Sequence, residues 1–120
     1  MKKLLLILSS LLITTAVWAQ VFTSPTFITS ETNETFYVYY DPAQSNAEMA
    51  NVAECYAHTG VILTTSKSDG DWKHASTWLD NSDKYKLKKE GNLWKLEITG
   101  GLKEYFNLAE GEVVTKIAFV

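Results

Sequence analysis

Alternation between apolar and polar residues is the dominant pattern of the chain after residue 20. Trp94, Leu96 and Ile98 occupy every second position, and Lys95 and Glu97 lie between them. A period of two is typical of a β-strand that buries one face. From this alternation and from the apolar runs elsewhere in the chain, the sequence predicts strands over residues 21–28, 36–40, 54–63, 84–89, 92–98 and 113–120.

Turn residues organise two of these strands. Glu90-Gly91-Asn92 separates 84–89 from 92–98, and its glycine can adopt a positive φ, so the two segments are predicted to form a hairpin. Pro25 interrupts the first strand, and its missing N–H is tolerated at a sheet edge. We therefore expect residues 21–28 to form an edge strand.

Helical patterns are short. Leu102, Tyr105, Phe106 and Ala109 follow the i, i+3, i+4, i+7 spacing, which predicts about two helical turns across the end of the sheets. Asp41-Pro42 is suited to begin a second short helix over residues 43–52, because aspartate is a good N-cap and proline fits the first helical position.

About six short strands and one or two short helices predict an all-β fold, and specifically an immunoglobulin-like β-sandwich. The chain stops inside an apolar strand at residues 117–120, where such a sandwich would normally add a further strand. We expect the final strand or strands to be missing, so that residues 20–120 are a C-terminally truncated domain. An unpaired apolar edge at 113–120 would favour self-association.

Residues 1–19 have the pattern of a signal peptide. Lys2 and Lys3 precede a mostly apolar run from Leu4 to Ala16, and Val17-Trp18-Ala19 suits cleavage before Gln20. The run is shorter than the roughly 20 residues that span a bilayer. We expect an exported protein, periplasmic, on the cell surface or extracellular, with no membrane association after cleavage; an uncleaved anchor is the alternative.

Charge and cysteine content restrict the function classes. Removal of Lys2 and Lys3 with the signal leaves nine lysines, no arginine and 14 acidic residues, a net charge of −5. This balance argues against nucleic-acid binding, which needs a basic face. Cys55 is the only cysteine, so no internal disulfide can form. We expect Cys55 to be a buried apolar residue; a reactive thiol is the alternative.

Several short motifs occur in an order that resembles a known domain. They are Tyr56-Ala57-His58-Thr59-Gly60-Val61-Ile62, Asp71-Trp72-Lys73, Gly91-Asn92-Leu93-Trp94-Lys95-Leu96, Leu102-Lys103-Glu104-Tyr105-Phe106, Glu110-Gly111-Glu112 and Lys116-Ile117-Ala118-Phe119-Val120. Together they resemble the N-terminal immunoglobulin-like domain of secreted Bacteroidetes α-amylase-family and starch-utilisation proteins, over about residues 21–120. The lipoprotein cysteine of the surface starch-binding proteins is absent.

The resemblance implies a glycan context. In that family the domain precedes a catalytic barrel or accompanies other starch-utilisation modules, so the implied partners are an α-glucan ligand and a C-terminal catalytic domain. The chain itself is expected to be no enzyme and to need no cofactor.

The segment around Trp72 and Trp78 contains the residue types that sugar binding needs. A flat aromatic ring packs on the C–H face of a pyranose, and polar groups bind its hydroxyls. Trp72 is expected to be the better exposed ring. For Trp78 two alternatives stay open, an exposed ring or a ring in the core, and Trp94 is expected in the core. The candidate carbohydrate-binding residues are Trp72, Trp78, Lys73, Asp71 and Asn81.

Metal and catalytic sites are not predicted. Cys55 and His58 are three positions apart, which places them on opposite faces of a regular strand. The acidic residues are scattered, so sequence cannot place two carboxylates at the spacing of a glycosidase. Two hypotheses remain: a weak starch-binding module, with no catalytic or metal site, and a structural spacer before a glycoside hydrolase domain.

Overall fold

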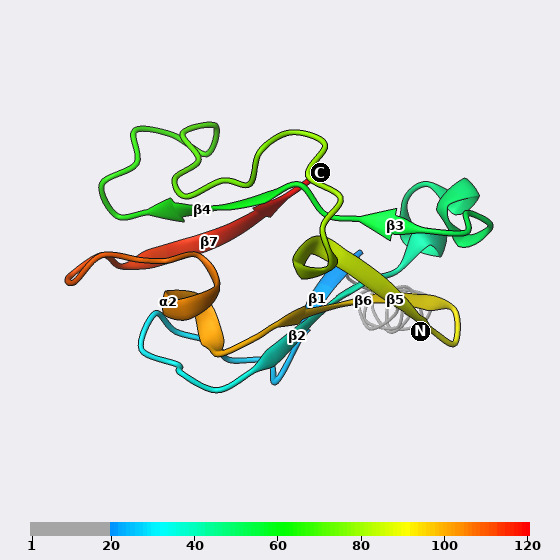
Figure 1. Cartoon of the computed structure of the whole chain (residues 1–120), viewed down its shortest axis with the longest axis horizontal. Coiled ribbons are helices and arrows are strands. Elements are labelled where there is room, and N and C mark those ends of the chain that lie inside the picture. The colour runs from blue at the N-terminus through cyan, green and yellow to red at the C-terminus, as the bar shows by residue number, and fades with distance from the viewer. Residues whose placement is uncertain (1–19) are drawn as a thin grey trace, which may run out of the picture.

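The computed structural model describes residues 20–120, and the predicted signal peptide at 1–19 lies outside them. The described chain consists mostly of strands in antiparallel sheets, with one α-helix and three short 3-10 helices (Figure 1). This confirms the prediction of an all-β fold. Within the described residues, no helix has both the length and the apolar character needed to cross a bilayer.

The larger sheet has five strands in the order β1-β2-β6-β5-β3. The predicted hairpin is confirmed, since β5 and β6 pair antiparallel around Gly91, whose φ is 60°. The edge strand predicted over residues 21–28 is confirmed over residues 21–24 only, because β1 pairs with β2 alone and ends directly before Pro25. The strands are β1(Val21–Ser24), β2(Phe36–Tyr40), β3(Cys55–Tyr56), β5(Lys86–Glu90) and β6(Leu93–Ile98).

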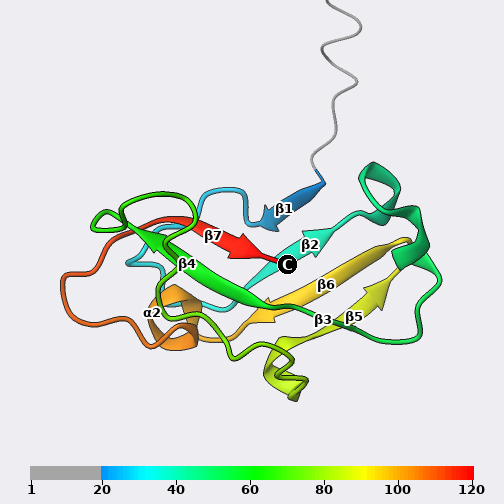
Figure 2. The same cartoon turned by 90° about the horizontal axis from the view of Figure 1, so that it is seen from above.

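The smaller sheet pairs β4(Thr59–Leu63) with β7(Val114–Phe119). Figures 1 and 2 show this pair lying over the larger sheet. The single strand predicted over residues 54–63 is wrong, since β3 and β4 belong to different sheets. The chain changes sheets between Ala57 and His58. The Ala57 N–H donates to the carbonyl of Tyr85, which ends the third 3-10 helix (Asp83–Tyr85) directly before β5, and the His58 N–H donates to the carbonyl of Val120 directly after β7.

The helices are shorter than the sequence predicted. The α-helix α2(Gly101–Tyr105) makes little more than one turn at the end of the sheets (Figure 1). The helix predicted over 43–52 is wrong: two 3-10 helices, Pro42–Gln44 and Ala47–Ala50, replace it. Asp41 caps the first, as expected of an N-cap, but Asn46 caps the second by accepting from the Glu48 N–H. Such side-chain bonds to the backbone compete with a continuous helix.

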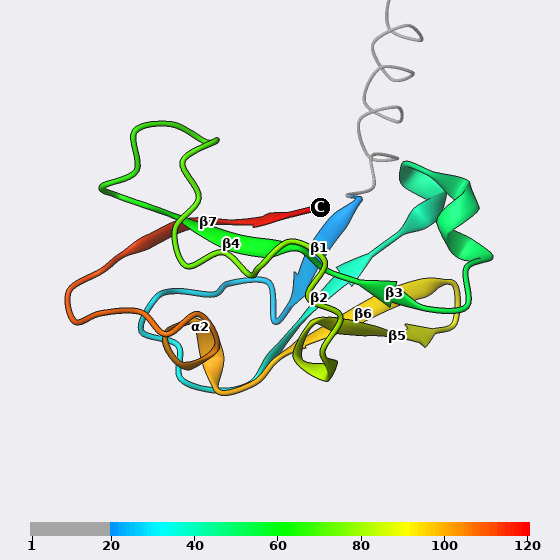
Figure 3. The same ribbon diagram turned by 45° about the horizontal axis from the view of Figure 1, so that its top comes forward.

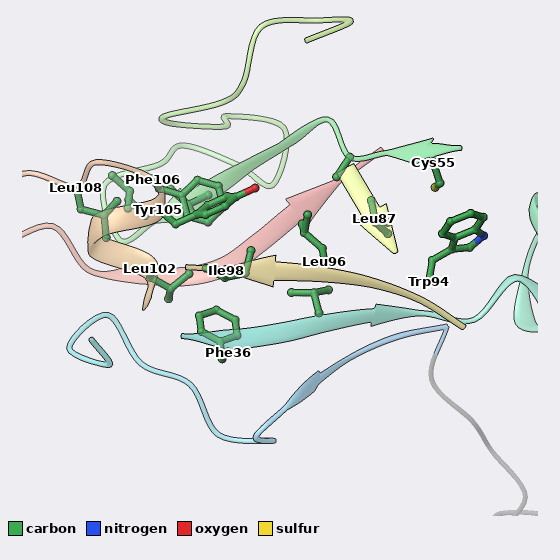
Figure 4. Packing of buried hydrophobic residues seen from close by; sticks show 14 residues of the cluster. Phe36, Cys55, Leu87, Trp94, Leu96, Ile98, Leu102, Tyr105, Phe106 and Leu108 are labelled. Atoms are coloured by element: carbon green, nitrogen blue, oxygen red, sulfur yellow. The ribbon is translucent and has the colours of Figure 1, made fainter. Parts of the chain in front are cut away.

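The core lies between the two sheets and against α2. Phe36, Leu96 and Ile98 are at most 1% exposed and point from β2 and β6 toward the helix and the upper sheet (Figure 4). Trp94 is 3% exposed and donates its indole N–H to the Met49 carbonyl at 2.8 Å, which confirms its predicted place in the core. Cys55 is buried as predicted, and burial raises the pKa of its thiol.

Candidate functional site

Residues 73–76 follow the outer edge of β4 and fix the tryptophan-bearing loop to the sheet. Val61 and Lys73 exchange two backbone hydrogen bonds of 2.9 and 2.8 Å, and the Ser76 N–H donates to Thr59. Gly60 permits this close approach, because a Cβ there would lie 3.0 Å from Ala75. The loop is therefore joined to one edge of the smaller sheet by an isolated β-bridge between Val61 and Lys73.

Side-chain contacts hold the same loop at two further points. Lys116 of β7 forms an ion pair of 2.8 Å with Asp69, and His74 lies 2.8 Å from the Glu112 carboxylate. The Ala109 N–H and His74 both contribute to lowering the pKa of Glu112, with the backbone bond the larger cause. The loop between β4 and β5 (residues 64–82) is thus tied to both β4 and β7 (Figure 3).

Trp72 packs against His58, the residue at which the chain enters the smaller sheet. The two ring centroids are 5.5 Å apart, and the ring planes are 28° from parallel. Ser76 holds the imidazole, since its hydroxyl lies 3.1 Å from Nδ1 while accepting the Thr59 N–H. One face of the Trp72 ring is therefore occupied within the protein, and the residue is only partly exposed.

Trp78 contacts the same imidazole from another direction. Its ring centroid lies 4.9 Å from that of His58, at an interplanar angle of 88°. The Trp78 side chain is 61% exposed. The expectation that Trp72 would be the better exposed ring is therefore wrong: flanking charges made Trp72 look like a surface residue, but the β4 edge draws its segment against His58.

The two indoles do not form one flat platform. Trp72 is nearly parallel to the His58 ring and Trp78 is nearly perpendicular to it, so the indole planes cannot be coplanar. A sugar packed on Trp78 would meet Trp72 through the shared imidazole rather than as a second stacking surface. The structure thus places both predicted tryptophans against the same imidazole, with their ring planes steeply inclined to each other.

Asn81 lies beside Trp78 in a shallow hollow of about 240 Å³. His58, Asp80 and the chain end at Val120 also line this hollow. It combines an exposed aromatic ring with an amide, a carboxylate and an imidazole, which are the groups that bind sugar hydroxyls.

Asp71 and Lys73 lie outside this hollow. Their side chains form an ion pair of 3.3 Å with each other, and the Asp71 carboxylate also accepts the Lys67 N–H at 3.0 Å. That backbone bond, followed by Lys73, lowers the pKa of Asp71. These two predicted site residues stabilise the loop locally and do not line the Trp78 hollow.

His58 is the residue of this site that sequence reasoning missed. From the sequence it was considered only as a partner of Cys55, and its two aromatic contacts come from residues 14 and 20 positions later in the chain. No local periodicity connects these positions. Within residues 20–120, no three metal-ligating side chains of the His, Cys, Asp and Glu type lie close enough together to hold an ion.

Comparison with models of known protein families gives no match, and comparison with curated proteins gives no match either.

Proposed function

We propose that this chain is a non-catalytic, carbohydrate-associated module of an exported glycan-degrading protein, and that it is an immunoglobulin-like β-sandwich. Its ligand is a starch-like α-glucan, bound in the hollow beside Trp78. The observation that supports this most is the 61% exposure of an indole held edge-on against His58 and adjacent to Asn81. An exposed ring of this size is otherwise unfavourable in water.

The site predicts weak binding. One stacking ring with a few polar neighbours corresponds to a dissociation constant of about 1 mM, or about −4 kcal/mol. Such affinity becomes effective when the module is linked to a second binding site or to an enzyme on the same polysaccharide. A module before a catalytic domain satisfies this requirement.

A spacer function is the second candidate, and the arrangement around Trp72 favours it. Trp72 is stacked on His58, while Asp71 and Lys73 are paired with each other. Three of the five sequence-derived candidates are thus occupied by contacts within the protein. A spacer would need no ligand, and the exposed Trp78 would then pack against the following domain.

Titration with maltoheptaose up to about 20 mM, followed by tryptophan fluorescence, separates these functions, since this range exceeds the expected dissociation constant. The binding module predicts a saturable change that Trp78→Ala abolishes. Phe27→Ala is the matched control, because it removes another exposed aromatic side chain (Phe27 is 91% exposed) that does not line the hollow. A flat titration for the unsubstituted chain would refute glycan binding and leave the spacer.

A further inference from the structure

The outer face of the larger sheet has a second concentration of aromatic and charged side chains, and the groove along it shares no lining residue with the Trp78 hollow. Buried residues such as Val38, Leu96 and Leu87 point inward, so their neighbours in each strand point outward. Across three strands, Tyr39 is opposite Lys95, and Lys95 is opposite Lys88. This face is the side of β2, β6 and β5 away from β4 and β7 (Figure 1).

A groove of about 610 Å³ follows this face. Its lining includes Tyr37 and Thr99. At one end it reaches Asp83 and Lys84, which precede β5, and Glu104 and Tyr105 of α2. The charged residues on the three strands that line it are Lys86, Lys88, Lys89, Lys95, Glu90 and Glu97. A ligand in this groove would therefore meet cations, carboxylates and an aromatic edge together.

The cross-strand pair of Lys88 and Lys95 is unfavourable for the fold alone, because like charges directly opposite each other destabilise a sheet. The neighbouring carboxylates offset little of this repulsion between the two lysines. Lys95 has Glu90 at 3.5 Å, and among residues 20–120 no carboxylate lies within ion-pair distance of Lys88. Lys86 has Glu54 at 3.5 Å, and that glutamate is 59% exposed. The three ammonium groups can accept an external anion.

Lys95 is held in place by its aromatic neighbours. Its Nζ lies 4.1 Å from the Tyr37 ring centroid and 5.9 Å from that of Tyr39. The Tyr39 ring in turn stacks on Phe22 of β1, with centroids 5.2 Å apart. The row Phe22–Tyr39–Lys95–Lys88 (the outer-face row) thus extends from an apolar end to a cationic end.

We propose that the outer-face row and its groove bind an acidic polysaccharide, with the carboxylates of uronic acid residues at Lys88, Lys95 and Lys86. Glu97 and Thr99 lie where sugar hydroxyls between the charged positions would donate and accept hydrogen bonds. The four carboxylates of the groove, from Asp83, Glu90, Glu97 and Glu104, disfavour a polyphosphate chain, whose charge is much denser. A polymer of sparse negative charge and many hydroxyls matches a groove in which five lysines are mixed with four carboxylates.

Titration of the chain with polygalacturonate at low ionic strength tests this proposal. The doubly substituted Lys88→Gln, Lys95→Gln chain is expected to bind at least fivefold more weakly, whereas Lys67→Gln, an exposed lysine of the β4–β5 loop, is expected to bind as the unsubstituted chain does. Added salt should weaken binding of the unsubstituted chain, because the contacts are ionic.

Three results would overturn the proposal: no binding of polygalacturonate, equal weakening by Lys67→Gln, or full retention of affinity in the double variant. A Trp78→Ala chain is measured in parallel and is expected to keep polygalacturonate binding. The site is independent of the proposed α-glucan hollow, so either can fail without the other. Circular dichroism verifies that each variant retains its strands.

Discussion

The ionisation of Tyr105 is coupled to folding. Its ring is 4% exposed, its hydroxyl donates to the Lys84 carbonyl at 2.7 Å, and the Lys84 ammonium donates to the Tyr105 carbonyl. Burial, and secondarily the neighbouring Tyr85, raises the pKa of Tyr105 well above its ordinary value. The folded state therefore holds this proton more tightly than the unfolded chain.

The free energy of unfolding is therefore expected to fall at alkaline pH. The contribution of Tyr105 to stability is fully present below pH about 10, where an unfolded tyrosine is still protonated, and is lost as the pH rises above that value. Urea unfolding between pH 8 and about 11.5 should show falling stability, and Tyr105→Phe should flatten the fall at a cost of about 1 kcal/mol at neutral pH. Tyr56→Phe is the control; an equal flattening there would contradict the role of Tyr105.

At the level of single residues, strand periodicity predicted burial well and loop exposure poorly. Trp94 alternates with Leu96 and Ile98, so its place in the core could be derived from the sequence. Trp72 and Trp78 lie in a loop without a period, and their exposure depends on contacts with His58 that no local pattern encodes. The structure therefore reverses the expected order of exposure of the two tryptophans, and it pairs Asp71 with Lys73.

Among the elements, the β4 edge and the segment 73–76 depend on the absence of a side chain at Gly60. In Gly60→Ala the new Cβ would lie 3.0 Å from the Ala75 Cα and 3.2 Å from the Lys73 carbonyl oxygen. The segment must shift away, so we expect a loss of about 1–3 kcal/mol in the free energy of unfolding. Trp72 should also become more accessible to acrylamide quenching.

Gly70→Ala is the matched control for this prediction. Gly70 is in the same loop, and its nearest atom to a new Cβ is the Ser68 hydroxyl oxygen at 3.7 Å, an ordinary contact. Its unfolding free energy should change by less than about 0.5 kcal/mol. Equal behaviour of the two variants would show that residues 73–76 are not packed against Gly60.

Local sequence patterns were sufficient to predict the β5–β6 hairpin, but they were insufficient to predict that the chain changes sheets between β3 and β4. The β5–β6 hairpin is encoded by two alternating runs around one glycine, all within 13 residues. The division of 54–63 into β3 and β4 depends on Tyr85 and Val120, which accept the bonds of Ala57 and His58 from distant parts of the chain. Alternation predicts a strand but not its partner, so the sheet assignment could not be derived.

The arrangement of the two sheets leaves one side of the molecule apolar and accessible. β1 and β7 are edge strands of the two different sheets. Between them lies a groove of about 420 Å³ lined mostly by apolar residues of β1, β2 and β7, among them Val21, Val38, Ile117 and Phe119. Figure 3 shows β1 and the end of β7 on this side. Burial of this surface would be favourable in proportion to its apolar area.

The backbone of β7 indicates how that burial would occur. Val120 exchanges hydrogen bonds with His58, so by alternation the N–H and C=O groups of Ile117 and Phe119 point away from β4. An antiparallel pairing of β7 with β7 of a second copy, centred on Ile117, would place each Lys116 opposite Ala118 and avoid facing like charges. We therefore expect the chain to form dimers as its concentration rises.

Sedimentation velocity over a wide concentration range measures this association. Ala118 is opposite Lys116 in this pairing and is not among the residues packed against the core, so Ala118→Lys would place like charges opposite each other and should shift the chain to the monomer. Val113→Lys introduces the same charge at a 47% exposed position just before β7 and should leave the dimer intact. A monomer at every concentration for the unsubstituted chain would contradict pairing through β7, and loss of the dimer in both variants would attribute association to net charge rather than to this edge.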